Sequence, residues 1–197
     1  MILEACRRNN TSLLEETIAD LGITAKKAGK KPAEVVAETL NKATDGVGNG
    51  VLHLAASYGS CMYTSDTASS NSILIATQTN THPDEVLDIL LDQEGLEIDE
   101  LDRMEQDTPL HKAVRYVNSL DKSEWASHGH PIVEILLDAG CDPRIRNKAK
   151  LKPIELTDPR NAELRSILQK GEFAMQAGGD VVEEDDDGPT GSASDSD

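Results

Sequence analysis

The stretch DTPLHKAVRYV, residues 107–117, is the part of this sequence that decides its fold. The hydroxyl of Thr108 can cap a helix, and Pro109 suits the first helical position, where no backbone N–H bond is lost. Leu110 and Val114 follow four residues apart, so they share one apolar face of a short helix. The stretch therefore predicts a short, capped helix with one buried side.

A second helix follows the first, and the pair occurs more than once. The segment GHPIVEILLDAGCD, residues 129–142, predicts a turn, an apolar helix and a stop at Gly140. Earlier in the chain LHLAASYG, residues 52–59, matches the pattern of LHKAVRYV, residues 110–117. Helix, turn, helix, glycine and a polar loop that leads to the next such start make up one repeating unit.

The plan resembles that of the ankyrin-repeat family, which implies an all-α solenoid of about four helix-turn-helix units with finger loops between them. The first unit lacks the TPLH box and is interpreted as an opening cap. The last unit keeps the proline of the box at Pro153, has Glu155 in place of the histidine, and is interpreted as a closing cap. We expect a repeat domain over residues 1–170 and a disordered acidic tail over residues 171–197. The units lie at residues 2–22, 48–59 continued at 83–95, 107–142 and 151–170.

Three insertions separate the repeat elements, at about residues 22–44, 60–82 and 118–128. The distance from Leu52 to Leu110 is 58 residues, about 25 more than the ankyrin period of about 33. Within the first insertion the segment KPAEVVAETLNKA predicts an additional amphipathic helix.

The second insertion has two interpretations. Residues 61–80, CMYTSDTASSNSILIATQTN, have neither a helical period nor a core pattern, and they split the two helices of their unit. The segment is either a Ser/Thr-rich loop or a retained intron, because the codons of residues 61–63 can spell a fungal-type splice donor and Gln78 an acceptor. Sequencing the transcript decides between the two.

Two departures from the ankyrin pattern concern the finger loops. Gly50 and Val51 replace the Thr-Pro pair in the second unit, so the helix that follows lacks a hydroxyl cap. Gln106 and Lys150 occupy positions where such loops turn on glycine, so we expect looser tips there.

The composition suits small helices packed closely, since only 3% of the residues are aromatic. No apolar run approaches the roughly 18 residues of a membrane span, so no membrane association is expected. Residues 1–20 lack a signal-peptide profile. Three cysteines, Cys6, Cys61 and Cys141, are odd in number and far apart, which predicts reduced, buried thiols in an intracellular protein.

The net charge of −17 is unevenly distributed. Residues 84–110 contain eleven acids and one base, and residues 180–197 contain eight acids and no base. Residues 141–179 have the opposite balance, with eight bases and five acids. A field this negative repels phosphate backbones, so we expect a basic protein partner and no direct nucleic-acid ligand.

No pattern in the sequence predicts catalysis. His53 and His111 belong to the repeat box, and the ankyrin resemblance implies that they bond nearby backbone and join neighbouring units. His128 and His130 could bind a metal, but no cysteine or acid cluster has the spacing of a metal site. The sequence has no phosphate loop, nucleophile elbow or dinucleotide fingerprint. We therefore expect neither an enzyme nor a cofactor.

A protein-binding surface is the remaining candidate site. In ankyrin stacks the finger loops and inner helices line a concave face that binds partners. The finger that opens the third unit is acidic, and its acids are interpreted as partner contacts, with a merely soluble surface as the alternative. Trp125, in the third insertion, either anchors a partner or packs the insertion against the stack. The candidate contacts are Tyr58, Asp99, Glu100, Asp102, Glu105, Asp107, Arg115, Tyr116 and Trp125, with tail contacts from Glu183, Glu184, Asp185, Asp186 and Asp187.

The layout is similar to that of small fungal ankyrin chaperones dedicated to one ribosomal protein, which combine a few repeats, a DPxIRNK-type passage and an acidic tail. In this sequence the passage is DPRIRNK, residues 142–148. The resemblance implies a monomeric, cytoplasmic chaperone that shields the basic small-subunit ribosomal protein uS3 before ribosome assembly, and it leaves nuclear entry open. The alternatives are a proteasome-assembly or signalling adaptor that binds a folded domain, and a regulatory subunit that inhibits an enzyme.

Overall fold

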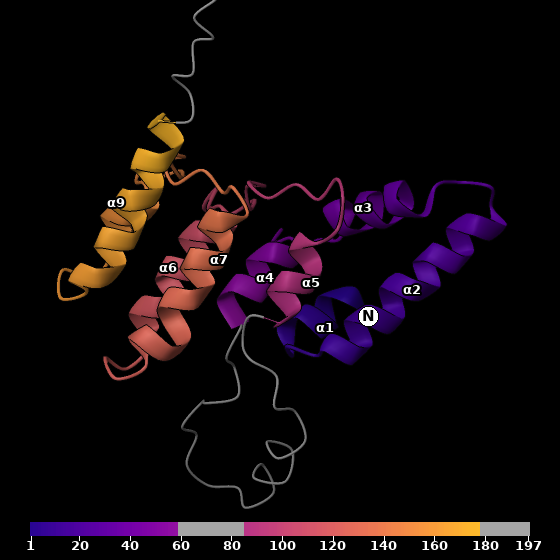
Figure 1. The fold of residues 1–197 in the computed structure, drawn as a ribbon, viewed down its shortest axis with the longest axis horizontal. Helices are drawn as coiled ribbons and strands as arrows, with labels where there is room; N and C mark the ends of the chain where they lie inside the picture. Colours follow the sequence, from indigo (N-terminus) through magenta and orange to yellow (C-terminus); the bar gives the residue numbers. More distant parts are fainter. Residues whose placement is uncertain (59–84, 178–197) are drawn as a thin grey trace, which may run out of the picture.

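The computed structural model of this protein describes residues 1–58 and 85–177, and the helices in these ranges form two layers (Figure 1). The helices are α1 (Ile2–Arg7), α2 (Thr11–Lys27), α3 (Pro32–Lys42), α4 (Val51–Tyr58), α5 (Glu85–Leu91), α6 (Pro109–Ser119), the π-helical turn η2 (Trp125–Gly129), α7 (His130–Asp138), α8 (Pro153–Leu156) and α9 (Ala162–Ala177). α1, α4, α6 and α8 contact one another in that order and form the inner layer. α2, α5, α7 and α9 form the outer layer in the same way.

Each inner helix also packs against the outer helix of its own unit, which gives the pairs α1–α2, α4–α5, α6–α7 and α8–α9. The four pairs lie side by side in chain order (Figure 1). The elements of the described residues are all helical. The expected all-α stack of four units is therefore confirmed.

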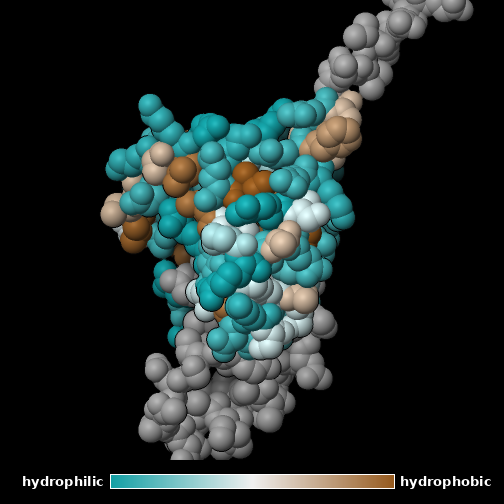
Figure 2. Space-filling model, turned by 90° about the vertical axis from the view of Figure 1, so that its left-hand side faces the viewer, coloured by the Kyte–Doolittle hydropathy of each residue, from teal (hydrophilic) through white to brown (hydrophobic). Residues whose placement is uncertain are grey.

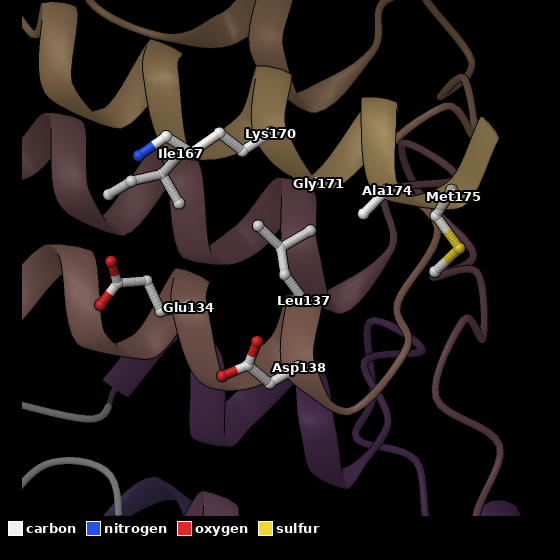
Figure 3. Close-up of a pocket in the computed structure, with 8 residues that line it drawn as sticks. All are labelled: Glu134, Leu137, Asp138, Ile167, Lys170, Gly171, Ala174 and Met175. Atoms are coloured by element: carbon white, nitrogen blue, oxygen red, sulfur yellow. The ribbon is translucent and has the colours of Figure 1, made fainter. Parts of the chain in front are cut away.

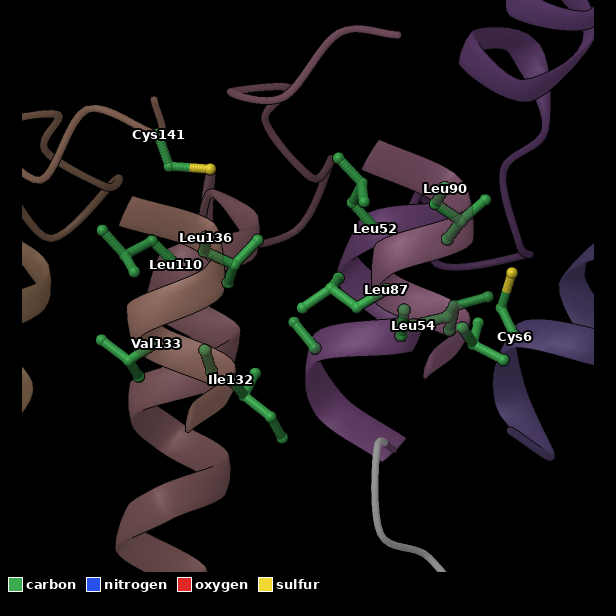
Figure 4. Close-up of a cluster of buried hydrophobic side chains, with 14 of the residues drawn as sticks. Cys6, Leu52, Leu54, Leu87, Leu90, Leu110, Ile132, Val133, Leu136 and Cys141 are labelled. Carbon is green, nitrogen blue, oxygen red and sulfur yellow. The ribbon is translucent and has the colours of Figure 1, made fainter. Parts of the chain in front are cut away.

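One hydrophobic core runs through the stack from the first unit to the last. Leu14 on α2, Leu54 on α4 and Leu168 on α9 are each no more than 1% exposed and belong to the same buried cluster. Figure 4 shows the central part of this cluster, where leucines of α4 and α5 face those of α6 and α7. Because every unit contributes to one core, each unit depends on its neighbours for burial.

The cysteines of the described residues are part of the core. Cys6 and Cys141 are free and buried, and burial raises the pKa of both thiols to about 12. The prediction of buried, unpaired thiols is thus confirmed for these two residues. Cys61 lies outside the described residues.

The two repeat boxes start their helices in different ways. Thr108 caps α6, since its hydroxyl oxygen accepts the N–H of His111 at 3.4 Å and Pro109 occupies the first turn. At the start of α4 the N–H of Gly50 donates to Nδ1 of His53 at 3.1 Å, just as the N–H of Thr108 donates to Nδ1 of His111 at 3.2 Å. The two starts therefore share the bond to the box histidine, and α4 lacks the hydroxyl cap that Thr108 gives to α6.

The predicted additional helix in the first insertion is confirmed as α3, and α2 extends into the same insertion as far as Lys27. The side chain of Asn41 fastens α3 to the loop after α5. Its amide donates to the carbonyl of Gly95 at 3.0 Å, and its oxygen accepts the N–H of Glu97 at 3.0 Å. The second insertion, residues 60–82, lies outside the described residues.

The third insertion packs against the stack. α6 continues to Ser119, and η2 leads into α7. The indole N–H of Trp125 donates to the carbonyl of Leu120 at 3.2 Å, and the side chain is only 9% exposed. Gly129 fits closely against α6, because a Cβ there would lie 2.9 Å from a methyl group of Val117.

The finger tips are closed turns, so the expectation of looser tips is wrong. Gln106 and Lys150 both adopt left-handed backbone conformations, with φ of 52° and 62°. In the loop that contains Gln106 the N–H of Asp102 donates to the carbonyl of Asp107 at 3.0 Å. A side-chain oxygen explains the closure, because the carboxylate of Asp102 accepts the N–H of Gln106 at 3.1 Å.

The last described helix, α9, continues to Ala177, seven residues beyond the expected end of the repeat domain at Lys170. The start of the expected tail, residues 171–177, is therefore helical, and residues 178–197 lie outside the described part of the chain. None of the helices over residues 1–58 and 85–177 is long and apolar enough to cross a membrane.

Candidate protein-binding surface

Three finger loops open the second, third and fourth units, and each is named after its unit: finger 2 (residues 43–50), finger 3 (residues 98–107) and finger 4 (residues 142–152). Finger 3 is part of the loop between α5 and α6 that crosses the upper edge of the stack in Figure 1. The N–H of Lys148 in finger 4 donates to the carbonyl of Glu105 in finger 3 at 2.8 Å. Fingers 3 and 4 are thus joined by a backbone hydrogen bond.

Asp102 is an internal residue of finger 3 and is only 2% exposed. One carboxylate oxygen accepts the N–H groups of Glu105 and Gln106, at 2.7 and 3.1 Å. The other lies 2.6 Å from Nζ of Lys112 on α6. Burial alone would raise the pKa of Asp102, but the hydrogen bonds from Lys112 and from the Glu105 N–H bring it below its ordinary value. This carboxylate closes the finger turn and ties it to α6.

Asp107 is fully buried and connects finger 3 to finger 4. Its carboxylate accepts hydrogen bonds from Nε of Arg115 at 2.8 Å and from the side-chain amide of Asn147 at 2.9 Å. Asp102 and Asp107 were expected to be surface contacts for a partner, and the structure contradicts this. Both are withdrawn from solvent because α6 supplies two basic side chains, Lys112 and Arg115, directly beneath them.

The box histidines link consecutive units. Nε2 of His53 lies 2.9 Å from the carbonyl of Asp107, and Nε2 of His111 lies 3.0 Å from the carbonyl of Leu151. Nδ1 of His111 accepts the N–H of Thr108 at 3.2 Å, which leaves Nε2 to donate. Burial lowers the pKa of both imidazoles. The prediction that they bond backbone and join neighbouring units is confirmed.

Asp99 and Glu100 are partly buried and also hold fingers in place. The Asp99 carboxylate accepts the N–H of Asp142 in finger 4 at 3.1 Å, and burial raises its pKa. Glu100 lies over the start of α4, where a Cβ on Gly50 would come within 2.4 Å of its carboxylate. Burial, and then the nearby charge of Glu97, raise the pKa of Glu100. A side chain at position 50 would therefore have to displace the carboxylate of Glu100.

The ankyrin-repeat family model matches residues 105–148, which contain α6, α7 and most of finger 4. The chain is also similar to ankyrin repeat-containing protein YGL242C of Saccharomyces cerevisiae. The two are 34% identical over 197 residues, which cover 96% of this chain and 89% of the yeast protein. This chain belongs to the ankyrin-repeat proteins. Its repeats form a protein-binding module, a class of fold that is typically not catalytic.

The part of the finger surface that remains open to a partner contains acidic, basic and apolar side chains. On and beside finger 3 the acids Glu97 and Glu105 are exposed, together with Arg103. Finger 4 exposes mainly bases. The tips add a row of exposed apolar side chains, namely Val47, Leu101, Met104 and Leu151.

The other predicted contacts have diverse positions. Arg115 is about half exposed on α6 while its guanidinium holds Asp107. Tyr116 packs against the core, and Trp125 packs the third insertion against the stack. The side chain of Tyr58 and the tail acids, residues 183–187, lie outside the described residues. The sequence analysis did not predict the burial of Asp102 and Asp107, although Lys112 and Arg115 on α6 were the signal for it.

A groove between the outer helices α7 and α9 was also missed. It has a volume of about 770 Å³, and Figure 3 shows its apolar floor, which includes Leu137 and Ile167, between Glu134 and Asp138 on one side and Lys170 on the other. Its lining contains no histidine, cysteine or hydroxyl side chain, so it offers no nucleophile or general base of these types. The remaining lining residues are Gly171, Ala174 and Met175.

The closing end of the stack has the polar outer face that ankyrin caps need for solubility. Figure 2 views this end, and most of its described surface is hydrophilic with small hydrophobic areas between. Exposed polar residues of α9, such as Arg165 and Gln169, contribute to it. Within residues 1–58 and 85–177 no group of three His, Cys, Asp or Glu side chains is placed to hold a metal ion.

Proposed function

We propose that this ankyrin-repeat protein is a dedicated chaperone that binds a basic ribosomal protein, the small-subunit protein uS3, and shields it before ribosome assembly. The observation that supports a basic client is charge: the chain has a net charge of −17, and Glu97 beside finger 3 and Glu105 on it are exposed next to apolar tips. Opposite charges on the client would speed encounter, and the apolar tips would hold it. The identity uS3 rests on the similarity of the layout to the fungal chaperones.

The proposed contact surface consists of the finger tips and of the acids that remain exposed. Asp102 and Asp107 act on it only indirectly, because they fix the shape of finger 3. Glu97 and Glu105 are the acids free to approach a client, since their side chains are exposed. Acids on an ordered backbone lose little conformational entropy on binding, which favours them as contacts.

A second candidate is an adaptor that binds a folded domain of mixed charge. It is favoured by the neighbouring charges of opposite sign, since finger 4 exposes Arg144, Arg146, Lys148 and Lys150 next to the acids of finger 3. The two candidates differ in their response to salt. A chaperone of a basic client loses affinity steeply as ionic strength rises, whereas an adaptor held by apolar tips and balanced charges loses little.

The test is the dissociation constant of the full chain for purified uS3, measured at about 50 mM and about 300 mM salt. The chaperone proposal expects tight binding at low salt and a loss of at least about tenfold at high salt. No binding at either concentration would exclude uS3 as the client. Tight binding that salt does not change would favour the adaptor.

A further inference from the structure

Finger 4 has a charge opposite to that of the whole molecule. Residues 142–152 contain five bases and one acid, in a chain of net charge −17. The finger is held in place by the bond between the Lys148 N–H and the Glu105 carbonyl and by its own turn at Lys150. It is therefore an ordered basic surface in an acidic protein. The five bases are Arg144, Arg146, Lys148, Lys150 and Lys152.

Part of this positive charge is not balanced by neighbouring carboxylates. Arg144 pairs with Asp142 at 2.8 Å, and Arg146 lies 3.2 Å from Glu155. These pairs are exposed and screened by water, so they contribute little to stability and can be exchanged for another partner. The ammonium of Lys148 donates to a backbone carbonyl. Neither Lys148 nor Lys150 has a carboxylate within ion-pair distance among the described residues.

The end of the repeat domain lies beside this finger. Nζ of Lys152 is 2.9 Å from the carboxylate of Glu172, so finger 4 contacts the second half of α9. Ala177, the last residue of α9, follows five residues later, which is about 7.5 Å along a helix. The chain therefore leaves the stack next to its most basic loop.

The sequence after this point supplies a complementary partner. Glu183 to Asp187 are five consecutive acids, and the residues between Ala177 and Glu183 begin with two glycines. Six residues of extended chain span about 20 Å, which is enough to return to finger 4 from the end of α9. A tether this short gives an effective concentration in about the millimolar range, so even weak ion pairs would be populated.

We propose that the acidic segment of residues 183–187 docks on finger 4 of its own chain. The docked segment would neutralise the positive charge of finger 4, so that a basic partner would meet a finger surface whose exposed charge is negative. An acidic ligand would have to displace the segment first. The proposal does not depend on the identity of any client.

Lysine labelling of the full chain tests the docking directly. A variant with Glu183→Gln, Glu184→Gln, Asp185→Asn, Asp186→Asn and Asp187→Asn is compared with the wild type at about 20 mM salt, using an amine-reactive reagent and mass spectrometry. Docking predicts that Lys148 and Lys150 react at least about threefold faster in the variant. Lys26 and Lys27, exposed at the end of α2, are the internal controls and should react equally in both proteins.

Two further outcomes decide the matter. At about 300 mM salt the difference between the wild type and the variant should disappear, because exposed ion pairs are screened. Carbodiimide cross-linking of the wild type should join finger 4 to residues 183–187 within single chains, with a yield that does not change on dilution. Equal labelling rates, or cross-links that form only between two chains, would overturn the proposal.

Discussion

Gln106 and Lys150 carry side chains at backbone positions that normally belong to glycine. Their φ values of 52° and 62° lie in the left-handed region, where a Cβ costs on the order of 1 kcal/mol. The turns close in spite of this cost because side-chain oxygens bond the backbone of each tip. Asp102 accepts two N–H groups in finger 3, and Asn147 accepts the N–H of Leu151 in finger 4. Hydrogen bonds at single residues thus decide the shape of the finger surface.

Replacing Gln106 with glycine should stabilise the protein. The substitution removes the strained Cβ and no buried contact, so we expect a gain of about 0.5–1 kcal/mol in the free energy of unfolding. The measurement is urea unfolding followed by circular dichroism. Glu105→Gly is the matched control: it adds flexibility at an exposed neighbour whose φ is negative, and it should lower stability. If Gln106→Gly is destabilising as well, the left-handed conformation at Gln106 does not strain the backbone.

The box histidines should make stability depend on pH. Burial lowers the pKa of His53 and His111 in the folded protein below the value of about 6.5 expected in the unfolded chain. The unfolded state therefore binds more protons in this window. The stability contributed by the neutral rings is complete above about pH 6.5 and is lost as the pH falls through the folded pKa.

We expect a lower urea midpoint at pH 5.5 than at pH 7.5, a range chosen to lie above the titration of most carboxylates. In His111→Gln the protein should be less stable at both pH values and the difference between them should shrink. His128→Gln, which replaces a histidine of η2 outside the two repeat boxes, serves as the matched control. An equal pH dependence in both variants would show that the box histidine is not responsible.

At the scale of the element, Asp107 is the residue that joins finger 3, α6 and finger 4. Its replacement by alanine leaves Arg115 and Asn147 without their buried acceptor, so we expect a loss of about 2–4 kcal/mol. Glu105→Ala, an exposed acid two residues away, should change stability by no more than about 0.5 kcal/mol. Thermal unfolding of both variants provides the comparison. Equal, small effects would mean that Asp107 is a surface acid after all.

α6 should be sensitive to loss of packing. Leu110 is fully buried between neighbouring units, and Leu110→Ala should cost about 2–5 kcal/mol through lost burial and a residual cavity. Leu151→Ala removes the same atoms from a finger tip that is exposed, and it should cost less than about 1 kcal/mol. A melting temperature that Leu110→Ala does not lower would contradict the position of the third unit.

The elements whose formation is local could be predicted from sequence. The capped start of α6 and the additional helix α3 follow from residues a few positions apart, and both are present. The burial of Asp107 and the contact of Glu100 with Gly50 depend on residues more than thirty positions away or on another unit. Charge along the sequence could therefore identify an acidic finger, but only the packing of finger 3 on α6 decides which of its acids face solvent.

On the scale of the whole molecule, the stack has two kinds of charged side chain: those that hold the fingers in place and those that are exposed to solvent. The finger 3 carboxylates that pair with α6 are buried, whereas Glu97, Glu105 and the bases of finger 4 lie on the open edge. The single core that runs through all four units keeps these fingers in register. The central claim is that the exposed acids beside the finger 3 tip recognise a basic client, and that tail acids contribute less.

The most direct measurement of that claim is the binding of uS3 to the double variant Glu97→Lys, Glu105→Lys, with association and dissociation rates at about 50 mM salt. The control variant Glu15→Lys, Glu16→Lys makes the same change of charge on exposed positions of α2. We predict that the finger variant binds at least about tenfold more weakly than the wild type, whereas the control stays within about threefold of it. Neutralising residues 183–187 should only slow association modestly. Wild-type binding by the finger variant, with binding abolished by the tail change, would contradict the account and make the tail the binding site.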